Sequence, residues 1–313
     1  MLRYKIKLLI CIFLFFPFSC KGQVAIDHNE LGTLDLSKDL RSIVFSYKKS
    51  GLSKIYIATS SGDSLRIMQE SLRDTSYVAP KFSYDSKHIL YLAFPSSTGG
   101  SNIFLLDRNG KNKKQLTFQN DIITEAVFSQ NSQKIYFVKA KSYNKYSPIG
   151  RKAPHDQDIY EYDLFTGNQK QITYLKAYSI SNLSEIFSGK YILSKLIGKG
   201  ANGMYIIDIK DPSAKNLIVP RNNPSEEPSR YGNPSFSEDV DRIAFTAPYE
   251  LYVMDLKSTN AKLVYRPKDK LIHMYNVILF DKGEKILFIN RQESSFHVIN
   301  SDGSNMRKFS LRL

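Results

Sequence analysis

The chain has 313 residues, of which 42% are hydrophobic and 24% are charged, and its formal net charge is +14. These proportions are typical of a folded soluble protein and exclude a mainly disordered chain. A single long apolar run excludes a multi-span membrane protein, and two cysteines exclude a disulfide scaffold. The 20 tyrosines and 19 phenylalanines favour β-strands.

Residues 1–19 predict a signal peptide. Three basic residues precede an apolar run from Leu8 to Phe16, which is too short to span a bilayer of about 30 Å. Ser19 then precedes Cys20, and this pair resembles the cleavage box of bacterial lipoproteins, in which the cysteine is acylated after cleavage. We therefore expect lipidation of Cys20, which would anchor the chain in a membrane. A cleaved signal without lipid and an uncleaved anchor are the alternatives.

The N-terminus also predicts a location in the bacterial cell envelope. The first acidic residue after Cys20 is Asp27, whereas surface-exposed lipoproteins of some bacteria carry an acidic run there. This favours an outer-membrane anchor that faces the periplasm, with residues 20–32 as the lipidated cysteine and a short tether. Export makes nucleic acid an unexpected partner, and the basic charge suits lipid headgroups, anionic glycan or an acidic protein. We expect a monomer.

An internal repeat organises the chain after the tether. Each copy opens with an apolar residue followed by serine or aspartate, and the copies begin at Leu36, Phe82, Phe128, Leu183, Phe236 and Phe280. A β-rich run follows, and then a second run with an aromatic residue or histidine three positions before a small polar one. Six units of about four short strands predict an all-β fold, a six-bladed β-propeller of four-stranded antiparallel blades at residues 33–313. A β-sandwich is the alternative.

The unit resembles the WD40-like repeat of the TolB family. The second copy matches with FSYDSKHILYLAF, NIFLLD and QLT, and the third with FSQNSQKIYFV, DIYEYD and QIT. No copy has the complete Ser-Pro-Asp-Gly turn of that repeat, and Phe or Leu replaces its usual Trp. The resemblance implies a propeller fold without implying a particular function. We expect a lone TolB-like propeller on a lipid anchor, without the N-terminal domain of TolB itself.

Two insertions explain the longest repeats. Residues 141–158 are expected as a loop between the second and third strands of blade 3, and residues 220–234 as a loop between blades 4 and 5. The fold resemblance implies that loops of these two kinds share one face, around a mouth of the central channel. We call it the loop-rich face, and we predict that it binds a partner. Solvated surface loops are the alternative.

The predicted partner-binding residues combine cations with aromatic rings, which suit an anionic partner. In the first insertion they are Tyr143, Lys145, Tyr146, Arg151, Lys152 and His155, and in the second they are Glu226, Glu227, Arg230 and Tyr231.

The sequence predicts no catalytic residue, no metal site and no cofactor. Nucleophile-elbow, zinc-binding and phosphate-loop motifs are absent from the sequence. His155 to Asp158 forms the only local His/Asp cluster, and a metal or acid–base role for it is the alternative reading. His297 occupies an aromatic position of the repeat and is expected as a packed ring. The aspartates that end the third strands are expected to bind their own turns: Asp107, Asp163, Asp208 and Asp255.

Two functions remain. The favoured one is a non-enzymatic propeller that binds an envelope protein, or an envelope glycan, on the loop-rich face. The alternative is a lyase or hydrolase that acts on anionic polysaccharide. Oligogalacturonate lyases share a related repeat, but they use a histidine-rich metal centre that this sequence does not allow us to reconstruct.

Overall fold

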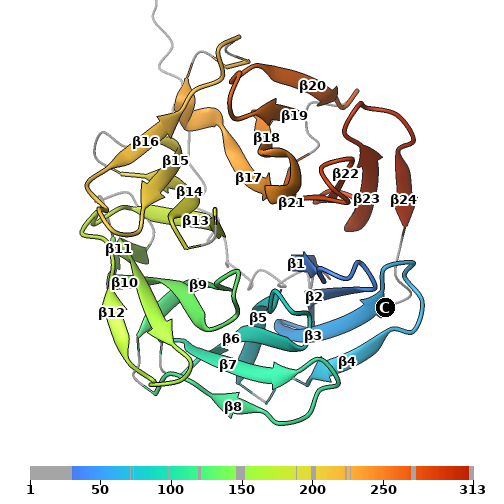
Figure 1. Ribbon diagram of the computed structural model, residues 1–313. Coiled ribbons are helices and arrows are strands. Elements are labelled where there is room, and N and C mark those ends of the chain that lie inside the picture. Colours follow the sequence, from blue (N-terminus) through green and yellow to red (C-terminus); the bar gives the residue numbers. More distant parts are fainter. Residues whose placement is uncertain are drawn as a thin grey trace, which may run out of the picture.

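A computed structural model of the protein describes residues 30–309, except 71, 73, 98, 119–120, 146–151, 188, 199–201, 223, 226 and 269–272. These residues form six four-stranded sheets arranged in a ring, which confirms the predicted six-bladed β-propeller (Figure 1). The first described strand starts at Glu30 and therefore includes three residues that precede the predicted boundary. The predicted signal peptide and Cys20 lie outside the described residues. Within the described residues, no helix has the length and apolar character needed to cross a membrane.

Each blade is built from one continuous stretch of chain, and its four strands, a to d, run from the channel outward. Blade 1 comprises β1 (Glu30–Leu36), β2 (Ser42–Lys49), β3 (Leu52–Thr59) and β4 (Arg66–Gln69). Blade 2 comprises β5 (Thr75–Phe82), β6 (His88–Pro95), β7 (Asn102–Asp107) and β8 (Lys114–Gln115). Blade 3 comprises β9 (Ile122–Phe128), β10 (Lys134–Lys145), β11 (Lys152–Asp163) and β12 (Gln169–Gln171).

The second half of the ring repeats this order. Blade 4 comprises β13 (Ser179–Ile186), β14 (Tyr191–Ile197), β15 (Gly203–Asp208) and β16 (Lys215–Ile218). Blade 5 comprises β17 (Gly232–Ser237), β18 (Arg242–Ala247), β19 (Glu250–Asp255) and β20 (Ala261–Tyr265). Blade 6 comprises β21 (Met274–Phe280), β22 (Lys285–Asn290), β23 (Ser295–Asn300) and β24 (Arg307–Phe309). Two short 3-10 helices, η1 (Pro228–Arg230) and η2 (Glu238–Val240), flank β17.

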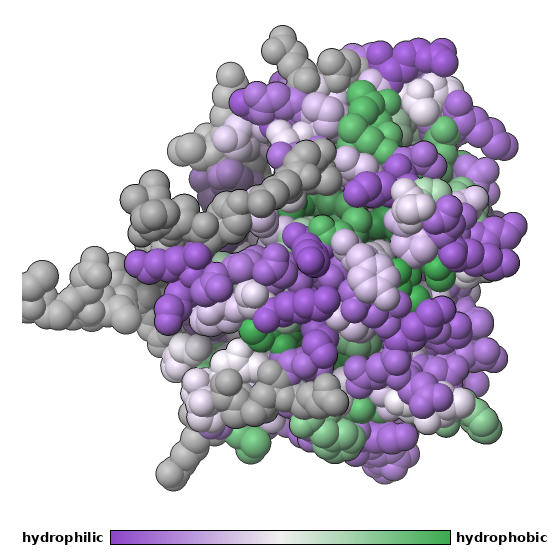
Figure 2. All heavy atoms as spheres, turned by 90° about the vertical axis from the view of Figure 1, so that its left-hand side faces the viewer, coloured by the Kyte–Doolittle hydropathy of each residue, from purple (hydrophilic) through white to green (hydrophobic). Residues whose placement is uncertain are grey.

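The antiparallel order places the connections on two faces. The b–c hairpins and the d–a connections lie on the loop-rich face, and the a–b and c–d turns lie on the opposite face, which we call the turn face. Hydrophilic residues cover most of the outer side formed by blades 3 and 4 (Figure 2). The apolar residues gather instead in six clusters, each of which joins two neighbouring blades. Stacking of blades around the ring thus buries both faces of each sheet.

The sixth cluster closes the ring between blades 1 and 6. Leu34 and Phe45 of blade 1 pack there with Leu287 and Phe296 of blade 6. All four strands of blade 6 come from the C-terminal segment, and β1 pairs only with β2. Side-chain packing, rather than an exchanged strand, therefore joins the two ends of the described chain. Residues 24–28, a candidate for an added strand, lie outside the described residues.

An aromatic pair recurs inside the blades and explains the aromatic position of the repeat. Tyr160 of strand c stacks on Phe137 of strand b, with ring centroids 5.5 Å apart. The same stacking joins four further pairs: Phe45–Tyr56, Tyr91–Phe104, Phe245–Tyr252 and Phe288–His297. His297 is therefore a packed ring, as predicted, and burial lowers the pKa of its imidazole.

The opening serine of the repeat organises the a–b turn. Ser83 Oγ accepts the N–H of His88 at 2.9 Å and donates to Asp85 Oδ1 at 2.6 Å. The turns that begin at Ser37 and Ser129 repeat this pattern. In blade 4 the prediction is wrong, because Ser184 lies inside β13 and the turn comes after Ile186.

A threonine after strand d, from the QLT and QIT sequences, holds strand c of its own blade. Thr173 Oγ1 accepts the N–H of Ile159 at 2.9 Å, and Thr117 Oγ1 accepts the N–H of Ile103 at the same distance. Both threonines are almost fully buried. The hydroxyl thus accepts a hydrogen bond from a buried strand N–H, for which no solvent water could act as the acceptor instead.

Replacing Thr173 by valine is expected to lower the free energy of unfolding by about 1–3 kcal/mol, because the buried N–H of Ile159 loses its acceptor. Thr173→Ser keeps the hydroxyl and is the matched control, with a smaller loss. Urea unfolding of the two variants measures the difference. A larger loss for Thr173→Ser than for Thr173→Val would show that the methyl group, rather than the hydroxyl, matters at this position.

Candidate functional site

The first insertion is not a loop, contrary to the prediction. Strands β10 and β11 of blade 3 extend beyond the blade as an antiparallel hairpin, and their pairing continues as far as Lys145 opposite Lys152. Each strand has 12 residues, so the backbone of the insertion satisfies its own hydrogen bonds. Only the tip, which includes Tyr146 and Arg151, lies outside the described residues.

The hairpin brings four predicted binding residues together. Tyr143 is 53% exposed, and Lys145 and Lys152 are also exposed. His155 is mostly covered, with its Nδ1 3.1 Å from Asp156 Oδ2 and its Nε2 bonded to Asn144 Oδ1. The side chains of Tyr143, Lys145 and Lys152 can therefore contact a partner directly, whereas His155 stabilises the hairpin.

The second insertion separates its predicted residues. Glu227 and Arg230 are exposed and form an ion pair with each other at 3.2 Å, while Glu226 lies outside the described residues. Tyr231 is fully buried, donates its hydroxyl to the carbonyl oxygen of Ser225 at 2.8 Å and packs edge-on against Phe245. The prediction that Tyr231 contacts a partner is therefore wrong, because the ring directly before β17 belongs to the core.

Residues of the His155–Asp158 segment also have structural roles. Asp158 is fully buried, and its carboxylate accepts the N–H groups of Leu175 and Lys176 and the hydroxyl of Thr173. Burial raises the pKa of this carboxyl group. Asp158 thus ties strand c to the connection that leaves strand d. Among the described residues, no group of three or more His, Cys, Asp or Glu side chains could hold a metal ion.

The aspartates that end strand c bind their own turns, as predicted. Asp163 Oδ1 accepts the N–H groups of Phe165 and Thr166, and these bonds lower the pKa of Asp163. Asp208 and Asp255 accept equivalent turn N–H groups. Asp107 instead accepts the side-chain amide of Asn112.

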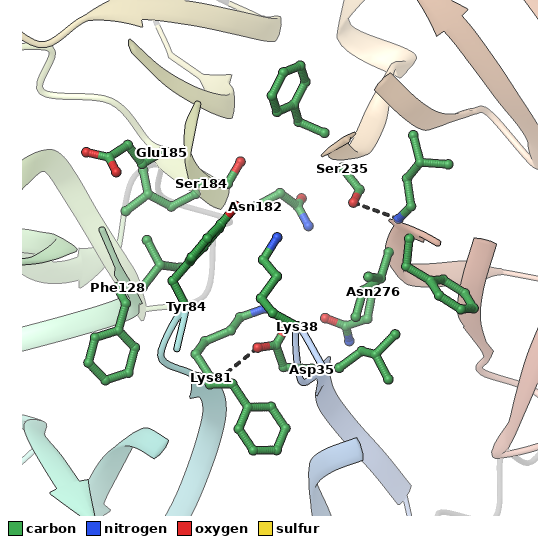
Figure 3. Close-up of a pocket in the computed structure, with 18 of the residues that line it drawn as sticks. Asp35, Lys38, Lys81, Tyr84, Phe128, Asn182, Ser184, Glu185, Ser235 and Asn276 are labelled. Atoms are coloured by element: carbon green, nitrogen blue, oxygen red, sulfur yellow. Dashed lines mark hydrogen bonds and ion pairs between the residues drawn. The ribbon is translucent and has the colours of Figure 1, made fainter. Parts of the chain in front are cut away.

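A cavity of about 660 Å³ occupies the central channel (Figure 3). The innermost strand of every blade lines it, together with the a–b turns that follow these strands. Because the a–b turns are part of its wall, the cavity reaches the turn face, on the opposite side from the predicted binding loops. The sequence prediction missed this site.

The acidic side chains of the cavity connect neighbouring blades. Asp35 of blade 1 accepts the N–H of Phe82 in blade 2 at 2.9 Å. Glu125 of blade 3 accepts the N–H of Leu183 in blade 4 at 2.9 Å. Glu185 of blade 4, in turn, accepts an N–H from the a–b turn of blade 3. These carboxylates therefore join neighbouring blades at two junctions, between blades 1 and 2 and between blades 3 and 4.

Burial affects the protonation of two carboxyl groups that line the cavity. It raises the pKa of Glu125 to about 7, although the nearby ammonium of Lys81 and two backbone N–H groups oppose the rise. Burial likewise raises the pKa of Glu185. Lys81 Nζ lies 3.7 Å from Asp35 Oδ1, so that pair is close to neutral overall.

The rim of the cavity presents an exposed cation. Lys38 follows the opening serine of blade 1, and its Nζ lies 4.7 Å from the centroid of the Tyr84 ring, from the equivalent turn of blade 2. Figure 3 shows the Lys38 side chain directed into the middle of the opening. Within the described part of the chain, no carboxylate forms an ion pair with Lys38. The position after the opening serine was the signal in the repeat that could have located this rim.

Two asparagines add amide groups to the wall. Asn182 and Asn276 sit at bulges of β13 and β21, where both have positive φ values of 57° and 50°. Asparagine tolerates this left-handed conformation better than most residues. The close-up shows both amides facing the channel (Figure 3). The cavity thus offers a cation, an aromatic ring and amide groups to a ligand.

No protein-family model matches the sequence, and no curated protein matches it. Among solved structures, TolB from Acinetobacter baumannii superposes with a TM-score of 0.65 at 16% identity, over 90% of this chain and 63% of TolB. The fold is that of the TolB propeller. This confirms the predicted TolB-like ring, although the chain spans less than two thirds of the TolB structure.

Enzymes share the TolB-like ring as well. An oligogalacturonate lyase in complex with manganese has a TM-score of 0.59 at 11% identity, over 90% of this chain and 77% of the lyase. A prolyl endopeptidase has a TM-score of 0.55 at 12% identity, over 91% of this chain and 43% of the peptidase. At such identities the similarity establishes the fold alone.

Proposed function

We propose that this TolB-like propeller is a non-enzymatic binding protein that holds a protein partner at the turn-face mouth of its central cavity. The observation that carries the proposal is that the acidic groups at this mouth are engaged within the protein, whereas a basic group is exposed. The carboxylates of Asp35, Glu125 and Glu185 are occupied by backbone N–H groups of neighbouring blades. Lys38, in contrast, is exposed above the Tyr84 ring and can pair with a carboxylate of the partner.

The proposal includes a cell-envelope location. Lipidation of Cys20, a periplasm-facing anchor and a monomeric state follow from the sequence and remain predictions. A polysaccharide lyase or hydrolase is the second candidate, because the manganese-bound oligogalacturonate lyase shares the fold. Metal-dependent cleavage of an anionic polysaccharide by the purified chain would favour that candidate.

Photo-crosslinking in cells tests where a partner binds. A crosslinking phenylalanine derivative is placed at Tyr84 on the cavity rim, at Tyr143 on the loop-rich face and, as a control, at Phe165. Phe165 is 97% exposed and lies in a c–d turn of the turn face, away from the cavity. We expect a discrete protein adduct from position 84 alone.

The variant Lys38→Glu should reduce the adduct at position 84 by about tenfold, because it places a like charge against an acidic group of the partner. A protein adduct from position 143 alone would instead move the partner to the loop-rich face, as the sequence predicted, and would overturn the cavity proposal. No adduct at any position, together with metal-dependent turnover, would favour the enzyme.

A further inference from the structure

The described chain enters the ring on the loop-rich face. Glu30, the first residue of β1, pairs with Lys48, next to the b–c hairpin turn of blade 1. Arg291, in the b–c turn of blade 6, forms an ion pair with Glu30 at 3.1 Å. Any tether from residues 20–29 must therefore leave from this face.

The loop-rich face carries an excess of unpaired positive charge. Within the described residues, six exposed lysines from blades 1, 3 and 5 and the connection between blades 3 and 4 form no ion pair: Lys48, Lys49, Lys145, Lys152, Lys176 and Lys268. Four carboxylates on this face have cationic partners, in the pairs Glu30–Arg291, Asp121–Lys139, Glu227–Arg230 and Glu250–Arg266. Asp74, which is exposed on the same face, accepts the hydroxyls of Thr75 and Ser97 instead. The face therefore attracts a surface of negative charge.

The turn face has a different charge pattern, which the repeat imposes. Every c–d turn carries a carboxylate: Asp63, Asp107, Asp163, Asp208, Asp255 and Asp302. These aspartates offset the lysines of the turn face, such as Lys87 and Lys111. The turn face also has exposed lysines, including Lys38 and Lys282, but it combines them with a carboxylate in every c–d turn.

Exposed aromatic rings also lie on the loop-rich face. Phe118 and Tyr174 directly follow the two buried threonines at the ends of blades 2 and 3, and they are 77% and 76% exposed. Tyr143, on the blade 3 hairpin, is 53% exposed. Aromatic rings beside lysines are the combination that proteins use at the headgroup level of a membrane.

From these observations we propose that the loop-rich face lies against an anionic phospholipid surface. If Cys20 is acylated, the ten residues from Cys20 to Asn29 reach at most about 35 Å, which keeps this face within reach of the bilayer. The lysines then bind the headgroups, and the cavity mouth on the turn face points away from the membrane. The inference concerns a surface outside the proposed partner site.

The test measures which face approaches lipid. A fluorescent amino acid is placed at Lys152 on the loop-rich face or at Lys87 on the turn face, both of which are exposed. The chain is purified in the form that cells produce and added to vesicles that contain a headgroup quencher. The vesicles are either phosphatidylcholine with about 30% phosphatidylglycerol or phosphatidylcholine alone, so that only surface charge differs.

On the anionic vesicles we expect quenching at position 152 to exceed that at position 87 by roughly threefold, and about 0.5 M salt to abolish the difference. Lys48→Glu with Lys49→Glu should weaken binding to the anionic vesicles, by about fivefold for each lysine lost. The matched control on the turn face, Lys111→Glu with Lys210→Glu, should leave the quenching at position 152 unchanged.

Two results would overturn the proposal: equal quenching at both positions, or an equal preference on neutral vesicles. Retention on neutral vesicles reports anchoring through the N-terminus separately from the orientation. The partner site at Tyr84 is tested by crosslinking alone, so either proposal can fail without the other.

Discussion

Replacing Phe45 by alanine is expected to lower the free energy of unfolding by about 3–5 kcal/mol. Phe45 is fully buried at the seam between blades 1 and 6, edge-on to Phe296 at 5.4 Å and stacked on Tyr56 at 5.5 Å. In the described residues no strand crosses this seam, so the packing of such side chains is what closes the ring. Chemical denaturation followed by circular dichroism measures the loss.

Phe165→Ala is the control, because this ring is 97% exposed in a turn of blade 3. Its effect should stay within about 0.5 kcal/mol. A loss below about 1 kcal/mol for Phe45→Ala would contradict the role of the seam in closing the ring, since cavities in a rigid core cost more than that. Closure would then depend on polar contacts such as the Glu30–Arg291 ion pair.

The fold could be predicted because each copy of the repeat contains the residues that its own blade needs for its turns and its packing. Serine opens the a–b turn, as Ser83 shows, because its hydroxyl satisfies two turn positions at once. An aromatic residue such as Tyr160 is needed in strand c because it stacks on strand b. These contacts form within one blade, so the same residue pattern recurs in each repeat. Six copies of the pattern suffice to indicate the ring.

The binding residues were harder to predict because their environment depends on distant segments. Tyr231 lies in a polar, proline-rich stretch that reads as a loop, yet its ring enters the core between blades 4 and 5. The sequence predicts a loop where the hairpin of β10 and β11 lies, because prolines and charged residues at its tip interrupt the β pattern. Pairing across the hairpin, with Tyr143 opposite Pro154, compensates for that composition.

The cavity could not be predicted because each blade contributes only a few of its residues. Asp35, Lys81 and Glu125 occur about 45 residues apart, in the spacing of the repeat itself, and none is distinctive in its own segment. Only closure of the ring brings them together. Asp35 and Glu125 accept backbone N–H groups of the next blade, which carry no sequence signal at all.

Glu125→Gln is expected to stabilise the protein above neutral pH. Burial raises the pKa of Glu125 to about 7 in the folded protein, whereas an unfolded chain has a value near 4.3. The folded state therefore binds the proton more tightly, and the contribution of Glu125 to stability falls as pH rises from about 4.3 to 7. At pH 8 the charged carboxylate costs about 3 kcal/mol, and glutamine avoids that cost while keeping an oxygen for the N–H of Leu183.

Urea unfolding of both proteins at pH 5 and pH 8 measures this effect, and the difference between them isolates Glu125 from the other buried acids, Asp158 and Glu185. The variant should gain up to about 3 kcal/mol relative to the parent at pH 8 and much less at pH 5. Glu284→Gln, at an exposed position of the turn face, should leave both values nearly unchanged. A loss of stability at pH 8 for Glu125→Gln would show that the attraction between Glu125 and Lys81 outweighs the cost of burial. In that case the inner wall would be held together by charge pairs, and the blade-to-blade hydrogen bonds would be secondary.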